Sequence, residues 1–148
     1  MNNKNQPFFS IVIPTYEREY DLRKCLLSLS PSIQHSTKDY EIIVTDDSIS
    51  SKSQNLVEDY FTNVKWGKGK LNGPAGNRNA GVDRSNGEWI IFIDDDCIAD
   101  SGYLNAYSNA ISENPDTILF EGLIYPDRPR KTFAECCPEN SSGGMFWT

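Results

Sequence analysis

Short runs of consecutive apolar residues alternate along the chain with longer segments in which apolar residues recur every three or four positions. The runs predict buried strands, because they are short and rich in β-branched residues. They cover 9–14, 40–45 and 88–93, a shorter run within 63–70, and a last run at 117–125. The periodic segments predict helices at 18–30, 50–61, 73–85 and 103–114, and a polar loop separates the first helix from the second strand over 30–39.

The order of these elements predicts the fold class. Strands and helices alternate, and the strands lack the in-out alternation of a half-exposed sheet. Strands of this kind belong to parallel sheets that are covered on both faces. We therefore expect an α/β protein, a three-layer α/β/α sandwich with a mostly parallel sheet.

No repeat or internal boundary divides the sequence, so we expect one domain over 1–148. After Tyr125 the regular pattern stops, and a turn-rich, charged stretch follows. The last residues, "MFWT", read as the beginning of another apolar element. We expect the domain to be truncated at its C-terminal end.

The composition indicates the kind of protein and its location in the cell. The 148 residues are 38% hydrophobic and 24% charged, which is typical of a soluble globular protein. No apolar run approaches the roughly 18 residues of a membrane span, and the first residues lack the layout of a secretory signal. These features favour a cytoplasmic location.

The net charge of −7 argues against a broad nucleic-acid surface, so we expect no nucleic-acid partner. Any phosphate ligand must be held locally, by a metal, a helix end or a few placed cations. The cysteines (Cys25, Cys97, Cys136 and Cys137) include no C-x-x-C pair, and His35 is the only histidine, so a structural zinc site is not expected.

Polar residues follow three of the predicted strands: Thr15-Tyr16-Glu17, Asp46-Asp47-Ser48 and Asp94-Asp95-Asp96. Each cluster alone is compatible with an ordinary turn. In a parallel sheet, however, all three lie at the edge where α/β proteins bind their ligands. Together with the intervening "GNRNAG" segment, they indicate a ligand site rather than three unrelated turns.

The three consecutive aspartates repel one another unless a positive partner compensates them. Carboxylates separated by one residue suit a hard divalent cation, and Mg²⁺ and Mn²⁺ commonly bind through one or two carboxylates together with substrate phosphates. We therefore expect Mn²⁺ or Mg²⁺ as cofactor, which would also bring an anionic diphosphate to an acidic protein.

The segments "SIVIPTYERE", "YEIIVTDDS", "GPAGNRNAG" and "WIIFIDDDCIAD" resemble, in this order, the recurring motifs of family-2 glycosyltransferases with the GT-A fold. The resemblance covers about residues 9–125, and its most specific parts are the DxD-type element and the "RNAG" helix. "SSGGMFW" is similar to the start of the acceptor-side segment of this family. The resemblance thus implies that 1–148 is a single glycosyltransferase-like domain, the donor nucleotide-binding half, in which 126–148 is the start of the acceptor-side region.

The resemblance implies a role for each polar cluster. The residues at the end of the first strand would line the nucleotide pocket: Pro14, Thr15, Tyr16 and Glu17. Asp46 would hydrogen-bond the base, and Asp47 would support its loop. Arg78 would reach toward the phosphates. Asp94 and Asp95 would bind the ribose or donor sugar, while Asp96, with Asp94, would bind the metal.

Two positions depart from the family pattern. Glu17 stands where many members carry Asn, and Cys97 stands where members often carry another acidic residue. The general base of the family lies beyond the acceptor-side segment, so we expect it after Thr148 and assign it to neither Glu135 nor Glu139.

The resemblance implies an inverting glycosyltransferase that moves a sugar from a nucleotide-diphospho-sugar, UDP-sugar foremost, to a hydroxyl of a glycan or lipid-linked acceptor in polysaccharide synthesis. It also suggests contact with the inner face of the membrane and a homodimer. The main alternative is a non-catalytic nucleotide-sugar-binding fragment.

Two further classes fit the sequence less well. A sugar nucleotidyltransferase would carry a G-x-G-T-R segment after its first strand, and "IPTYERE" has none. A phospho-receiver domain would carry an acidic pair there, where this chain has Thr-Tyr-Glu.

Overall fold

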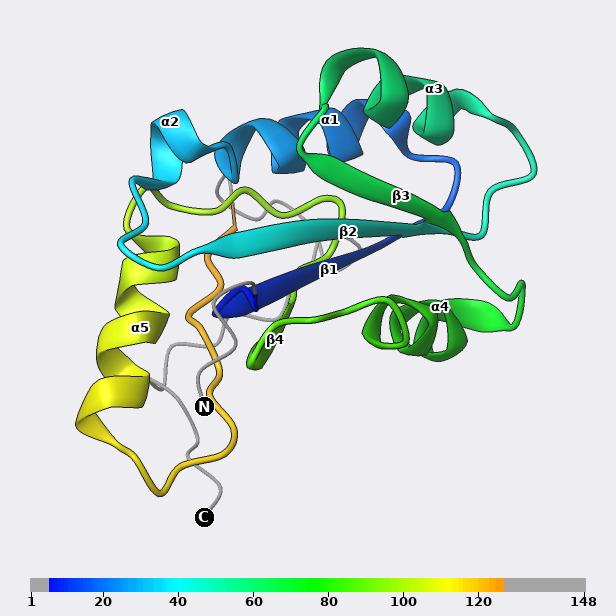
Figure 1. Ribbon diagram of the computed structural model, residues 1–148. Coiled ribbons are helices and arrows are strands. Elements are labelled where there is room, and N and C mark those ends of the chain that lie inside the picture. The colour runs from blue at the N-terminus through cyan, green and yellow to red at the C-terminus, as the bar shows by residue number, and fades with distance from the viewer. Residues whose placement is uncertain (1–5, 127–148) are drawn as a thin grey trace. The chain divides into compact units, whose positions relative to one another are not determined.

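The computed structural model describes residues 6–126 and contains a parallel sheet with helices between its strands (Figure 1). In chain order the elements are β1 (Phe9–Thr15), α1 (Glu19–Ser28), α2 (Pro31–Gln34), β2 (Tyr40–Asp46), α3 (Lys52–Tyr60), β3 (Val64–Lys68), α4 (Gly73–Val82), β4 (Trp89–Phe92) and α5 (Tyr103–Glu113). Residues up to Asn105 form one compact unit, and residues from Ala106 onward form a second.

Within the first unit, the described strands form a four-stranded sheet in the order β3-β2-β1-β4, and each neighbouring pair is parallel. Every residue of β1 is buried, which explains the uninterrupted apolar run from which this strand was predicted. Helices α1 and α3 cover one face and α4 covers the other (Figure 1). The expected α/β/α sandwich with a parallel sheet is confirmed.

Helix α2 corrects the predicted polar loop over 30–39. The helix begins at Pro31, whose fixed φ suits the first turn. It positions Gln34, whose buried amide donates hydrogen bonds to the carbonyl oxygens of Ser28 at 2.7 Å and Asp100 at 2.8 Å. These buried hydrogen bonds hold the short helix to the end of α1 and to the loop before α5.

The predicted strand over 117–125 is also wrong. Only Leu119 makes a β-bridge there, and the rest of the described segment is irregular. An apolar run becomes a strand only where a neighbour completes its hydrogen-bond ladder. In this segment Ile118 and Leu123 are 78% and 48% exposed, unlike the side chains of a buried strand. The predicted acceptor-side region, 126–148, lies outside the described residues apart from Pro126.

The contact between α4 and the sheet requires a residue without a side chain. A Cβ placed on Gly81 would lie 2.3 Å from a methyl carbon of Val12, which is fully buried in β1. The helix can therefore approach the sheet closely only with glycine at this position.

Within residues 6–126, no helix combines the length and the apolar character required to cross a bilayer.

We predict that Gly81→Ala lowers the free energy of unfolding by about 1–3 kcal/mol, because overpacking against a buried strand outweighs the gain in helix propensity. Urea denaturation measures this change. Gly102→Ala is the control, since its added Cβ would meet nothing within 4 Å. Equal stability of the two variants would contradict the close-packing account.

Candidate functional site

The carboxyl ends of the strands bring the three polar clusters of the sequence to one edge. Thr15 is paired with Asp46 across β1 and β2, and Asp46 with Lys68 across β2 and β3. The aspartates 94–96 follow β4, which is paired with β1 on its other side. Residues far apart in the sequence therefore lie close together at the edge where open α/β sheets bind ligands.

A buried hydrogen bond ties the first cluster to the third. The Thr15 hydroxyl donates to Oδ2 of Asp95 at 2.6 Å, and Asp95 is only 5% exposed. Burial raises the pKa of the Asp95 carboxyl, while the Thr15 hydrogen bond and the nearby Arg18 partly oppose that rise. The Asp95 carboxylate is thus held in a buried hydrogen bond at this edge and is not exposed to solvent.

The two flanking aspartates are open and each pairs with an arginine. Nη1 of Arg18 lies 2.8 Å from Oδ2 of Asp96 and 3.5 Å from Oδ1 of Asp95. Nη2 of Arg78 forms an ion pair with Oδ1 of Asp94. The side chains of Asp94 and Asp96 are 55% and 52% exposed, so both keep access to solvent and ligands.

Arg18 is a residue that the sequence patterns did not single out. Asp95 first and then Asp96 raise the pKa of its guanidinium. Its place directly after the polar cluster at the end of β1 was the available clue. With Arg78, it offsets the like-charge crowding of the three aspartates.

Asp46 and Asp47 are buried and organise the loops around them. Oδ1 of Asp46 accepts a hydrogen bond from the Ser48 amide at 2.7 Å, and Oδ2 accepts one from the Trp66 indole at 3.3 Å. Oδ1 of Asp47 accepts one from the Leu71 amide at 2.9 Å. Asp47 thus holds the loop at Leu71, while the roles expected of Asp46 and Asp47 toward a nucleotide stay predictions.

Glu17 joins the loops that follow β1 and β2. Its φ of 52° places it in the left-handed region, and its amide donates to Oγ of Ser48 at 2.7 Å. Its carboxylate accepts bonds from the Ile49 amide and from the amide and hydroxyl of Ser50. These bonds lower the pKa of Glu17, the Ser50 hydroxyl most of all. Glu17 therefore fixes the turn between β1 and α1.

The other two residues predicted to line the pocket differ in exposure. Pro14 is buried within β1, where it contributes packing and backbone, while Tyr16 is 57% exposed beside it. Tyr16 is thus open to a ligand, and any contribution of Pro14 is indirect.

Asn77 holds α4 against the strand ends. Its buried side-chain amide donates to the carbonyl oxygens of Thr15 at 3.2 Å and Thr45 at 2.9 Å. Because Arg78 follows directly, this clamp also sets the position from which Arg78 reaches Asp94. Sequence reasoning missed Asn77, although an amide within a helix of small residues was a visible exception.

Among residues 6–126, no group of three or more His, Cys, Asp or Glu side chains is arranged to hold a metal ion. Asp94 and Asp96 nevertheless offer hard, exposed oxygen donors. This donor set fits a cation that takes one or two carboxylates and completes its shell with water and substrate phosphates. It does not fit an all-protein metal cage.

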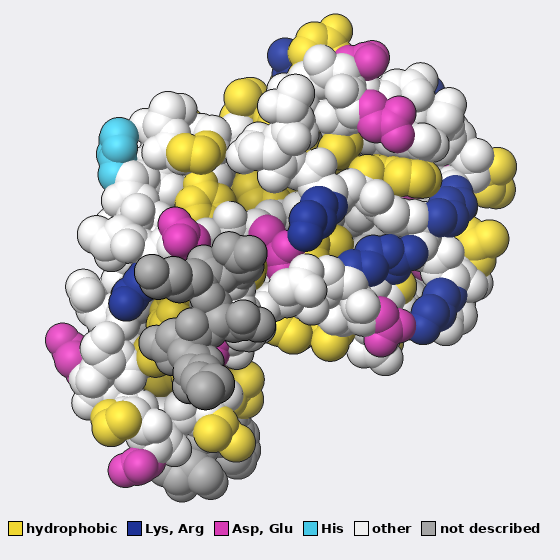
Figure 2. All heavy atoms as spheres, viewed as in Figure 1, with side chains coloured by type: hydrophobic (Ala, Val, Ile, Leu, Met, Phe, Trp, Pro, Cys, Tyr) yellow, Lys and Arg dark blue, Asp and Glu magenta, His cyan; other side chains and the backbone are white. Residues whose placement is uncertain are grey.

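Cations are available near the edge despite the negative net charge. On the face seen in Figure 2, most visible Lys and Arg side chains lie in the right half, with Asp and Glu among them. Lys68, the last residue of β3, donates to the carbonyl oxygen of Ser48 in the adjacent loop. An anionic ligand would thus meet locally placed positive charge.

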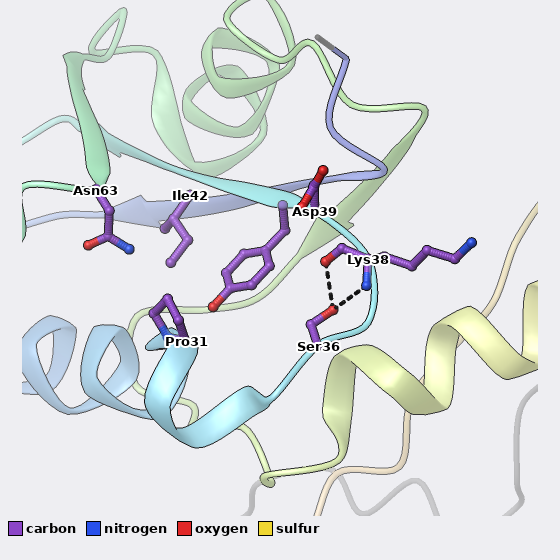
Figure 3. Close-up of a pocket in the computed structure, with 7 residues that line it drawn as sticks. Pro31, Ser36, Lys38, Asp39, Ile42 and Asn63 are labelled. Atoms are coloured by element: carbon purple, nitrogen blue, oxygen red, sulfur yellow. Dashed lines mark hydrogen bonds between the residues drawn. The ribbon is translucent and has the colours of Figure 1, made fainter. Parts of the chain in front are cut away.

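A separate pocket of about 490 Å³ lies at the opposite, amino-terminal end of the strands (Figure 3). Its lining includes Ser36, Lys38 and Tyr40, and Ser36 and Lys38 are hydrogen-bonded to each other. None of the residues implicated by the sequence patterns lines it, so the carboxyl edge remains the candidate site.

A family model described as "Glycosyl transferase family 2" matches residues 10–134. A GalNAc(5)-diNAcBac-PP-undecaprenol β-1,3-glucosyltransferase of Campylobacter jejuni is 33% identical over 127 residues, which are 80% of this chain and 39% of that protein. A poly(ribitol-phosphate) β-glucosyltransferase of Bacillus spizizenii is 32% identical over 88% of this chain and 22% of its own length. The chain thus spans less than half the length of these relatives.

Solved structures agree with the sequence comparisons. The crystal structure of Staphylococcus aureus TarS is 28% identical, with a TM-score of 0.65 over 84% of this chain and 24% of that one. TarS 1–349 in complex with UDP-GlcNAc is 29% identical, with a TM-score of 0.60 over 72% of this chain and 32% of that one. The described fold is therefore the fold of the corresponding part of TarS.

We predict that Thr15→Val destabilises the protein by about 1–3 kcal/mol at neutral pH, because it leaves the buried Asp95 carboxylate without its donor. The substitution should raise the pKa of Asp95 further. A raised folded-state pKa favours folding below the unfolded pKa, and this advantage is lost as the pH rises through the folded value. The loss caused by Thr15→Val should therefore be larger at pH 7 than at pH 4, as measured by urea denaturation.

Thr45→Val is the matched control. The Thr45 hydroxyl is buried one strand away and has no hydrogen-bond partner in the described part of the chain. This variant should be neutral or slightly more stable at both pH values. Equal destabilisation by the two substitutions would show that the hydrogen bond to Asp95 is not what holds the edge together.

Proposed function

The chain belongs to glycosyl transferase family 2, and from this membership we propose that it binds a nucleotide-diphospho-sugar, UDP-sugar foremost, at the carboxyl edge of its sheet. We propose further that the complete protein transfers the sugar to an acceptor hydroxyl with inversion. The observation that carries the proposal is the convergence of exposed Asp94 and Asp96, buried Asp95 and two arginines at one sheet edge.

Arg78 suits the diphosphate of the donor. It extends from a helix that Asn77 clamps to two strands, so its guanidinium is presented from a rigid base. Guanidinium groups bind phosphate oxygens with charge-assisted hydrogen bonds. In sugar transfer the diphosphate gains negative charge as it leaves, and a cation placed beforehand at that point lowers the barrier.

Asp96 and Asp94 are the residues that would hold a divalent cation. Such an ion, when bound, would further offset the charge of the leaving diphosphate. Because the described residues include no three-ligand cluster, we propose that the phosphates of the donor complete the metal shell. Metal and nucleotide should then bind together more tightly than either binds alone.

The remaining residues of the edge position the donor-binding groups. Asp95 is fixed by Thr15, and Glu17 and Asp47 fix the loops on either side. Exposed Tyr16 borders the same turn and is available for a nucleotide. Inversion also requires a base for the acceptor proton. For this chain we propose donor binding alone. The base is proposed for the complete protein.

The relatives suggest the acceptor class. The Campylobacter enzyme is named for an undecaprenol-linked glycan, and the Bacillus enzyme for poly(ribitol-phosphate). We propose a glycan or lipid-linked acceptor in polysaccharide synthesis, with action at the inner face of the membrane and a homodimer as further proposals. A module that binds the donor without transferring the sugar is the alternative, since every residue assigned above acts on the donor.

Calorimetry with UDP, in the presence and absence of Mn²⁺, tests the donor site. We predict that UDP binds appreciably only with Mn²⁺ and that Asp96→Asn weakens binding about tenfold or more, as loss of a metal-site interaction does. GDP and dTDP, titrated in the same way, report the preference for the base. Donor hydrolysis and transfer assays then separate an enzyme from a binding module.

Asp100→Asn is the control, because this exposed aspartate lies outside the 94–96 cluster. It should bind UDP as the wild type does. UDP binding that needs no metal, or that survives Asp96→Asn unchanged, would refute the metal role of Asp96.

A further inference from the structure

Arg18 pairs with the carboxylate of Asp96, the residue that is proposed to bind the metal. Its Nη1 lies 2.8 Å from Oδ2 of Asp96. We propose that Arg18 is an exchangeable partner, which pairs with Asp96 until a cation and nucleotide bind and then turns to the donor diphosphate. This inference rests on the function proposed above.

The ion pair between Arg18 and Asp96 can open with little loss of stability. The side chains of Arg18 and Asp96 are 55% and 52% exposed, and ion pairs exposed to this extent contribute little stability. The pair between Arg78 and Asp94 is more enclosed, because the Arg78 side chain is only 33% exposed. Arg18 is therefore the arginine that releases its aspartate more readily.

The backbone of Arg18 is fixed although its side chain is not. Glu17, directly before it, is held in a left-handed conformation by hydrogen bonds to the loop after β2. The carbonyl oxygen of Arg18 accepts a hydrogen bond from the Leu22 amide at 2.9 Å, which joins it to the first turn of α1. A change of partner thus requires only side-chain rotation.

The guanidinium of Arg18 has further N–H donors that can bind a phosphate. Among the described residues, the ion pairs and hydrogen bonds of Arg18 use Nη1 alone. An arginine carries five N–H donors in a planar fork that matches phosphate oxygens. Within residues 6–126, Nε and Nη2 of Arg18 are therefore not engaged and can donate to phosphate oxygens.

The charges predict opposite effects on metal and nucleotide. Asp94, Asp95 and Asp96 face two guanidinium groups, so removal of Arg18 makes the cluster more negative and uncovers Asp96. A cation alone should then bind more tightly. The diphosphate loses a partner at the same time, so the nucleotide should bind more weakly. A residue with a purely structural role would shift both affinities in one direction or neither.

Two titrations on Arg18→Gln test this. Electron paramagnetic resonance of free Mn²⁺ should show about two- to fivefold tighter binding of Mn²⁺ alone, the scale of one exposed ion pair. Calorimetry at saturating Mn²⁺ should show about tenfold weaker binding of UDP, the scale of one charge-assisted hydrogen bond. Thermal unfolding should stay close to that of the wild type, because Thr15 still donates to buried Asp95 and the pair with Asp96 is exposed.

Arg23→Gln is the matched control. Arg23 lies on α1, carries the same charge and stacks over Tyr60 rather than on the aspartates. It should change neither titration. In an Asp96→Asn background, Arg18→Gln should no longer tighten Mn²⁺ binding, because the carboxylate that it uncovers is gone.

The outcomes separate the two proposals. If the wild type binds UDP with Mn²⁺ but Arg18→Gln leaves both affinities unchanged, or shifts them in the same direction, the exchange role of Arg18 is overturned while the donor site stands. If the wild type binds no UDP, with or without Mn²⁺, the proposed function fails and the exchange proposal fails with it.

Discussion

The buried hydrogen bond from Thr15 to Asp95 is the contact on which the geometry of the carboxyl edge depends. It joins the end of β1 to the segment after β4, and Asp95 is almost fully enclosed. Because the central aspartate is anchored, its two neighbours remain exposed on either side of it. One buried carboxylate thereby determines where two open ones are available for a ligand.

The parallel topology brings acidic residues together at this edge, and it also brings the arginines that offset their repulsion. Strands that run in one direction collect their polar ends together, and three of those ends carry acidic residues. Arg18 lies directly before α1 and Arg78 lies in the middle of α4, and these two helices cover opposite faces of the sheet (Figure 1). Both arginines pair with the exposed aspartates. We expect such an edge to accept a cation and an anion together more readily than either alone, as the proposed metal-assisted diphosphate site requires.

Much of the fold, but less of the site, could be predicted from the sequence. The strands β1 and β2 were recognisable because burial on both faces demands an uninterrupted apolar run, and β4 carries a similar run although only Ile91 of this strand is buried. The run at 117–125 is also mostly apolar, but in the described part of the chain it forms only a single β-bridge, at Leu119, and composition does not reveal pairing. Thr15 with Asp95 and Arg18 with Asp96 are contacts between distant segments, so only the folded chain shows them. The ligand roles of these residues remain predictions.

Titration of isotopically labelled protein with UDP and Mg²⁺, followed by amide NMR, tests most directly whether the carboxyl edge is the donor site. We expect chemical-shift changes to concentrate at residues 15–18, 46–48, 69–73, 75–78 and 94–97, where the strand ends, Arg18 and Arg78 lie. Changes concentrated instead around Ser36, Lys38 and Tyr40, at the opposite end of the sheet, would contradict it.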